Sequence, residues 1–199
     1  MISAVEALER LRDGNRRFVD GNTSAAASAN QARRAELVGG QNPFAVILAC
    51  ADSRAPVELI FDQGLGDLFV IRVAGNIVAP SQIGSVEFAA SQLGTKLVVV
   101  LGHSNCAAVD ATLKELAREQ QHRSPNLRAI VNRIRPALEP MLESGADVAL
   151  HEAVAVNVRN SVRRLQNGSL ILRKLIDDGD LTIVGAEYSI ESGEVEVFD

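Results

Sequence analysis

Short apolar runs alternate along the chain with longer amphipathic segments. Runs rich in Val, Ile and Leu are typical of strands that are buried on both faces. Four such runs predict strands at 44–49, 68–73, 97–101 and 181–185. The segments between them predict helices at 83–93, at 107–120 and from 126 to about 166, the last broken near Pro140 and Gly145. This alternation predicts an α/β fold whose central sheet has about four parallel strands and is flanked by helices.

The two ends of the chain carry further patterns. Apolar residues recur every three positions from Ile2 to Leu11 and continue at Phe18 and Val19, which predicts an amphipathic helix ending near residue 20. A Ser/Ala-rich stretch, 23–29, leads into a second short helix that ends at 39–40. Residues 194–198 alternate polar and apolar, which predicts an edge strand, with antiparallel pairing as one option. We therefore expect one domain, 1–199, with an N-terminal helical arm at 1–40 and an α/β core at 41–199. The apolar face of the arm must pack on something, and a partner subunit is one candidate.

Composition narrows the class of protein. A chain of 199 residues suits one sizeable domain, and 47% hydrophobic with 23% charged residues is an ordinary globular balance. The formal charge is −5 and the basic residues are scattered, so nucleic acid is not an expected partner. The longest apolar runs have about eight residues, whereas a membrane-spanning helix needs roughly 20. The N-terminal segment carries acidic residues, unlike a secretory signal, and this favours a cytoplasmic location.

Three potential metal ligands follow two of the predicted strands. Cys50 follows the first strand, and His103 and Cys106 follow the third. Ligands of open α/β sheets bind at the carboxyl ends of the strands, where these residues fall. Zinc prefers thiolate and imidazole ligands, and a catalytic zinc site keeps three protein ligands and one open position. The N-terminus of the following helix favours the thiolate form of Cys106. The pattern predicts a zinc site, with a redox pair of the two cysteines as the alternative.

Asp52 and Arg54 follow Cys50 at alternate positions. In an extended segment Cys50, Asp52 and Arg54 would lie on the same side. Asp52 can then be a fourth zinc ligand, or it can form a bidentate ion pair with Arg54. We expect two positions for Asp52, one on the metal and one on Arg54. The redox alternative leaves His103 and Asp52 unexplained. The other two histidines, His122 and His151, are expected at the surface.

These motifs resemble those of a known family. The sequence Cys50-Ala51-Asp52-Ser53-Arg54, followed about fifty residues later by Gly102-His103-x-x-Cys106, is similar to the β-class carbonic anhydrases. The likeness continues through 61–72 and 75–76 and reaches 185–188. It implies a lyase that hydrates carbon dioxide to bicarbonate and a proton by attack of zinc-bound hydroxide, with one Zn²⁺ per subunit. It also implies a homodimer or a dimer of dimers, in which the N-terminal helices embrace the partner and the active site lies at the interface.

The resemblance also implies roles for single residues. Asp52 would accept a hydrogen bond from the hydroxide, and Arg54 would keep Asp52 off the zinc. Gln41 matches a glutamine that reaches a neighbouring active site to hold substrate, and Phe69 matches an apolar wall of the carbon dioxide pocket. Ala107 stands where the family usually has a glycine whose backbone N–H lies close to the substrate, and its methyl group narrows the pocket.

A second pocket of some family members is not expected in this chain. Those members hold a non-catalytic bicarbonate with Trp, Arg and Tyr. Arg72 and Tyr188 match two of these positions, but Ile47 occupies the tryptophan position. Without an indole N–H donor we expect no inhibitory bicarbonate site of that type, and we assign Arg72 and Tyr188 structural roles.

Three alternatives to a carbonic anhydrase remain at the level of sequence. The same metal and scaffold can serve a hydrolase of carbon disulfide or carbonyl sulfide. A non-catalytic zinc protein would keep Asp52 as a permanent fourth ligand in a closed site. A thiol redox protein would need no metal.

Overall fold

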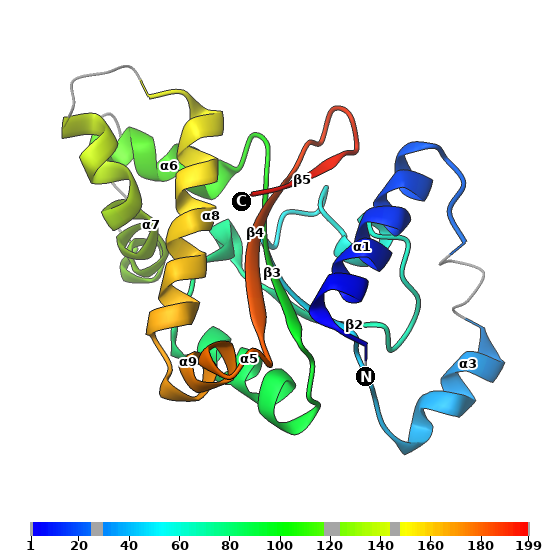
Figure 1. The fold of residues 1–199 in the computed structure, drawn as a ribbon. Coiled ribbons are helices and arrows are strands. Elements are labelled where there is room, and N and C mark those ends of the chain that lie inside the picture. The colour runs from blue at the N-terminus through cyan, green and yellow to red at the C-terminus, as the bar shows by residue number, and fades with distance from the viewer. Residues whose placement is uncertain (1, 25–29, 118–123, 144–147, 199) are drawn as a thin grey trace.

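A five-stranded sheet forms the centre of the molecule. The computed structural model describes residues 2–24, 30–117, 124–143 and 148–198 (Figure 1). The strands lie in the order β2-β1-β3-β4-β5; the first four are parallel and β5 is antiparallel to β4. Their bounds are β1 Ala45–Ala49, β2 Leu68–Arg72, β3 Leu97–His103, β4 Thr182–Tyr188 and β5 Val195–Val197. The predicted fold class is confirmed, and the edge strand takes the antiparallel option.

The central strands are apolar throughout because both of their faces are covered. All five residues of β1 and all seven of β3 are buried. In β1, Ala45, Ile47 and Ala49 belong to the apolar cluster on one face of the sheet, while Val46 and Leu48 belong to the cluster on the other. Burial on both faces therefore explains why these runs show no polar alternation.

Helices cover both faces of the sheet (Figure 1). On one face α1, Ala4–Val19, buries Ala7 and Leu11. The other face is covered by α5 Pro80–Gln92, α8 Leu150–Asn167 and α9 Leu170–Asp177. Two further helices, α6 Ala107–Leu116 and α7 Pro125–Glu143, pack beside α8. The short helical segments are α3 Gln31–Glu36, η1 Leu37–Gly39, α4 Val57–Ile60 and η2 Ala74–Asn76.

The expected break at Pro140 is wrong, because α7 continues to Glu143. Pro136 and Pro140 both lie on the exposed side of this helix, where water can bond the carbonyl groups that lose their intrahelical partners. Ile134 and Leu138, on the opposite side, are fully buried and hold the helix to the core. The break expected at Gly145 lies outside the described residues.

The N-terminal arm divides into two parts. The apolar stripe of α1 is buried against this chain's own sheet, whereas α3 and η1 have no buried residue. In Figure 1, α3 lies apart from the helices that cover the sheet. None of the helices in the described ranges combines the length and apolarity that a membrane crossing needs.

Candidate metal centre and active site

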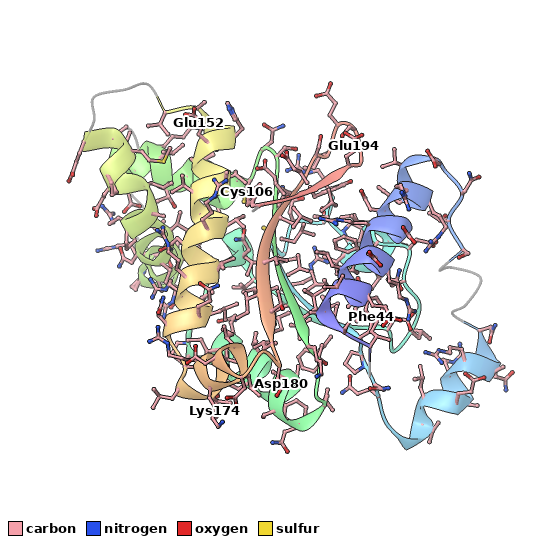
Figure 2. The ribbon with its side chains drawn as sticks, viewed as in Figure 1. Phe44, Cys106, Glu152, Lys174, Asp180 and Glu194 are labelled. Atoms are coloured by element: carbon pink, nitrogen blue, oxygen red, sulfur yellow. The ribbon has the colours of Figure 1, made fainter. Side chains whose placement is uncertain are left out.

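The three potential ligands meet at the carboxyl ends of two adjacent strands. Cys50 directly follows β1, His103 is the last residue of β3, and Cys106 is the N-cap residue of α6. Their ligand atoms all lie within 4.8 Å of one another, and all three residues are buried. Figure 2 places Cys106 at one end of the sheet and Asp180, which precedes β4, at the other. The structure therefore brings together the cysteines and the histidine that the sequence singled out.

His103 presents a free ring nitrogen at this point. Its Nδ1 lies 2.9 Å from the carbonyl oxygen of Ser104. Because a carbonyl oxygen only accepts, Nδ1 carries a proton, and the lone pair of the neutral ring is therefore on Nε2. Nε2 is buried and has no hydrogen-bond partner within the described residues. A metal-binding histidine has this arrangement, with one nitrogen bonded to a carbonyl group and the other facing the ion.

The side chains of the two cysteines contact each other through the hydrogen of one thiol. Their Sγ atoms are 4.0 Å apart, and both cysteines are free. The hydrogen bond from Cys106 lowers the pKa of Cys50 to about 4, against the effect of burial. The same contact with the Cys50 thiolate, together with burial, raises the pKa of Cys106. A bound cation would take the place of that proton and leave two thiolates, so the donor set fits a metal.

Asp52 lies in a turn, not in an extended segment as expected. The backbone N–H of Ala55 donates to the Asp52 carbonyl, at 3.1 Å, and the Arg54 N–H donates to Oδ1, at 2.9 Å. A short acidic side chain that bonds the backbone two residues later stabilises such a turn, and this competes with an extended conformation. The turn nevertheless keeps Asp52 beside the site, because its Oδ2 lies 3.8 Å from Nε2 of His103.

Of the two positions expected for Asp52, the structure has the one on Arg54. Arg54 Nε donates to Oδ1, at 3.0 Å, and Nη2 donates to Oδ2, at 2.8 Å. These hydrogen bonds hold the pKa of the Asp52 carboxyl well below its usual range. Arg54 Nη2 also donates to the carbonyl oxygen of Asn105, at 3.3 Å, and so joins the loops that follow β1 and β3.

Comparison with known proteins identifies the family. A family model described as carbonic anhydrase matches residues 45–195. A carbonic anhydrase of Mycolicibacterium smegmatis is 39% identical over 193 residues, which cover 97% of this chain and 92% of the relative. The solved β-carbonic anhydrase CcaA is 28% identical with a TM-score of 0.78, covering 98% of this chain and 88% of that one. This chain is a β-class carbonic anhydrase. Tetrameric β-carbonic anhydrases of Sordaria macrospora share its fold, with a TM-score of 0.74 at 24% identity, covering 85% of this chain and 87% of that one.

Further side chains of this carbonic anhydrase stabilise the segments next to the proposed metal ligands by hydrogen bonds. Arg72, at the end of β2, donates from Nε to the Cys50 carbonyl, at 3.0 Å, and from Nη2 to the Asp52 carbonyl, at 2.5 Å. These contacts agree with the structural role assigned to it. Sequence reasoning missed Asn157 and Ser161, which reach the turn beside Cys50 from α8. Their signal was two polar residues four apart in the otherwise apolar, buried stripe of a helix.

The residues that the family resemblance adds have different surroundings. Gln41 is exposed and makes no side-chain hydrogen bond within the described part of this chain. Phe69 is half-buried on β2, with its ring centroid 6.3 Å from that of Phe88. Ala107 follows Cys106 directly as the first, exposed residue of α6. His151 is exposed at the start of α8, and His122 lies outside the described residues.

Proposed function

We propose that this carbonic anhydrase uses one Zn²⁺ per subunit, held by Sγ of Cys50, Nε2 of His103 and Sγ of Cys106, to hydrate carbon dioxide reversibly to bicarbonate and a proton. The unpartnered Nε2 beside two buried sulfur atoms carries this proposal. Two thiolates and one imidazole suit zinc, and three protein ligands leave a position open for water. The bound ion supplies Lewis acidity that turns water into a nucleophile near neutral pH.

Asp52 and Arg54 have complementary parts in the proposed reaction. Asp52 stays ionised because of its hydrogen bonds to Arg54. Its carboxylate lies close enough to the ligands to accept a hydrogen bond from the attacking water and to orient it. While Arg54 holds both carboxylate oxygens, Asp52 is kept from the metal. A fourth, protein-derived ligand would belong to a closed state in which Asp52 has left Arg54.

Three further residues are proposed to contact substrate. Phe69 would provide an apolar wall for carbon dioxide, and Gln41 would reach the site of a neighbouring subunit. The backbone N–H of Ala107 belongs to the first turn of α6, where N–H groups have no intrahelical partner and favour negative charge. This N–H can therefore donate a hydrogen bond to an oxygen atom of bicarbonate. The methyl group of Ala107 leaves less space for the substrate beside this N–H than a glycine would.

We also propose a homo-oligomer, a dimer or a dimer of dimers, with the active site at the interface. Exposed apolar side chains support it: Val38 is 86% exposed, Leu59 51% and Phe88 49%. Within the arm, residues 1–40, α3 and η1 would pack on the partner, since α1 already covers this chain's own sheet, and 41–199 would form the catalytic core of a single domain. A reducing, cytoplasmic location belongs to this proposal because it keeps Cys50 and Cys106 as thiols.

Metal analysis and stopped-flow kinetics test the proposed function together. We expect one zinc per subunit, rapid carbon dioxide hydration, loss of activity after chelation, and its return with added zinc. Carbon disulfide is the control substrate, and turnover of it without carbon dioxide hydration would favour the alternative hydrolase. Zinc without either activity would favour a non-catalytic site. Cys106→Ser, which loses one ligand, should lose both metal and activity.

A further inference from the structure

The turn after β2 directs a backbone N–H at one of the metal ligands. Gly75 donates its N–H to Sγ of Cys50, at 3.3 Å. Gly75 and Asn76 both have positive φ angles, of 67° and 43°. Glycine, and after it asparagine, are the residues that adopt this region most readily, so the two residue types suit a tight turn here. The turn is also tightly enclosed, since a Cβ added at Gly75 would lie 2.8 Å from Cδ1 of Ile134.

Two side chains of α8 hold this turn from behind. Asn157 Nδ2 donates to the carbonyl oxygen of Gly75, at 2.9 Å. Ser161 Oγ donates to the carbonyl oxygen of Asn76, at 3.0 Å. Both residues are 1% exposed. They lie four positions apart, on the side of α8 that also buries Val158.

Anchoring a loop would by itself explain buried polar groups, since a buried donor is tolerated when it is hydrogen-bonded. The hydrogen bond from the Gly75 N–H to Sγ of Cys50 gives these two side chains a role beyond anchoring a loop. Gly75 takes part in both contacts: its carbonyl oxygen accepts from Asn157, and its N–H donates to the Cys50 sulfur atom. A hydrogen bond to a thiolate withdraws part of the charge that the sulfur donates to a metal, and such contacts orient ligands and tune the ion. A rotation of the turn would therefore change the electronic character of Cys50 as well as the packing.

We propose that Asn157 and Ser161 are positioning residues for the metal ligand Cys50. By fixing the Gly75–Asn76 turn they keep the Gly75 N–H on Sγ, which limits charge donation to the ion and holds the sulfur in place. This inference rests on the proposed metal site. It assigns a function to two helix residues more than fifty positions away in sequence from any ligand.

The test uses Asn157→Leu, which keeps a similar volume and removes the donor. We expect zinc affinity, measured by competition with a chromogenic chelator, to fall roughly 10- to 100-fold, because the loss of a fixed sulfur position outweighs the stronger charge donation. In the cobalt-substituted protein the thiolate-to-cobalt charge-transfer band should move to longer wavelength, because a sulfur without its N–H donor releases an electron more easily. Ser161→Ala should shift both quantities in the same direction by a smaller amount.

Leu165→Ala is the matched control. Leu165 is fully buried on α8, and it packs in the apolar cluster between the sheet and the helices α5, α8 and α9. The substitution should lower the thermal stability while affinity and band stay unchanged. A folded Asn157→Leu protein with the wild-type affinity and band would overturn the proposal, as would a loss of affinity with an unmoved band. If Asn157→Leu does not fold, unchanged values in Ser161→Ala overturn it. A wild-type protein without the band would overturn the metal site itself, and the assignment with it.

Discussion

Arg54 donates three hydrogen bonds to the carboxylate of Asp52, one from its backbone N–H and two from its guanidinium group. The same carboxylate has one oxygen 3.8 Å from Nε2 of His103. The Asp52 carboxylate therefore lies between the guanidinium group of Arg54 and the proposed metal position. A rotation of its side chain would exchange one partner for the other, so the pair can set whether the fourth position is open to water.

Asp52→Asn tests the part of this carboxylate in catalysis. The amide keeps the size of the side chain but is a weaker acceptor and carries no charge. Since Asp52 is not among the three ligands, the variant should bind zinc as the wild type does. Its kcat/KM for carbon dioxide hydration should fall by about 10²-fold or more, the usual contribution of a proton-handling group. Zinc analysis and stopped-flow assays measure the two quantities, and near-normal turnover with full zinc would remove Asp52 from the mechanism.

The clustering of the three proposed ligands could be predicted because two independent patterns coincide there. Continuous apolar runs locate the parallel strands; Cys50 directly follows one run, and His103 and Cys106 lie within five residues of the end of another. Both β3 and β4 extend beyond their predicted ends, to His103 and Tyr188. These two residues are partners in the register of the sheet, so pairing between strands, which a single run does not reveal, sets the ends.

Other features depend on contacts between distant segments. The turn at Asp52 arises from a competition between backbone and side-chain hydrogen bonds that periodicity does not report. Asn157 and Ser161 meet the turn after β2 across more than 80 positions of sequence, at separations of 82 and 85. A buried polar residue in a helix signals that a partner exists, but only the tertiary structure identifies it.

Metal removal should expose the two cysteines to oxidation. Their sulfur atoms are 4.0 Å apart, so a small movement brings them to the disulfide bond length of about 2.05 Å. We expect a thiol oxidant such as diamide to join Cys50 and Cys106 in the zinc-free protein, with reduction of the diamide and loss of two thiol hydrogens. The zinc-loaded protein should keep both thiols, because the metal occupies the sulfur lone pairs.

Thiol titration and mass spectrometry under non-reducing conditions follow this oxidation. The chain has only these two cysteines, so an intramolecular disulfide identifies the pair without further mapping. The oxidised protein should not take up zinc until a reductant is added. Cys106→Ser is the control and should form no intramolecular disulfide. Equal oxidation rates with and without zinc would contradict the assignment of both sulfur atoms as ligands.

Gly102→Ala tests the close packing of α8 on the strand that carries His103. A Cβ at Gly102 would lie 2.5 Å from Cγ2 of Val158 and 3.2 Å from Cγ1 of Val154. The helix would have to move away from β3, so we expect a loss of about 1–3 kcal/mol in the free energy of unfolding. Urea denaturation measures this loss. Because His103 is the next residue, zinc affinity should fall as well.

Gly84→Ala is the matched control for that substitution. Gly84 lies within α5, and a Cβ there would meet nothing within 4 Å. Alanine is the better helix former, so this variant should be more stable by about 0.5–1 kcal/mol. If the two variants change stability by the same amount in the same direction, the close approach at Gly102 is not what limits that position.

Glu187 provides a test of pH dependence at a residue that is neither a proposed ligand nor a proposed catalytic group. It lies on β4 and is half-buried, and burial raises the pKa of its carboxyl. The charge of His151 opposes this effect, and the Glu196 carboxylate adds to it. The folded state therefore holds the proton of Glu187 more tightly than the unfolded state does. The stabilising contribution of the protonated form is complete below the unfolded pKa of about 4.3 and is lost as pH rises through the folded pKa.

Glu187→Gln should reverse this loss because the amide never ionises. The difference in unfolding free energy between the variant and the wild type should be small near pH 4. As pH rises, the variant should become more stable relative to the wild type. The difference should become constant above the pKa that Glu187 has in the folded wild type. Urea denaturation of both proteins at several pH values from 4 to 8 measures it. Other titrating groups are the same in both proteins and cancel in the difference. A difference that does not vary with pH, or that favours the wild type at pH 8, would show that Glu187 ionises in the folded protein without cost.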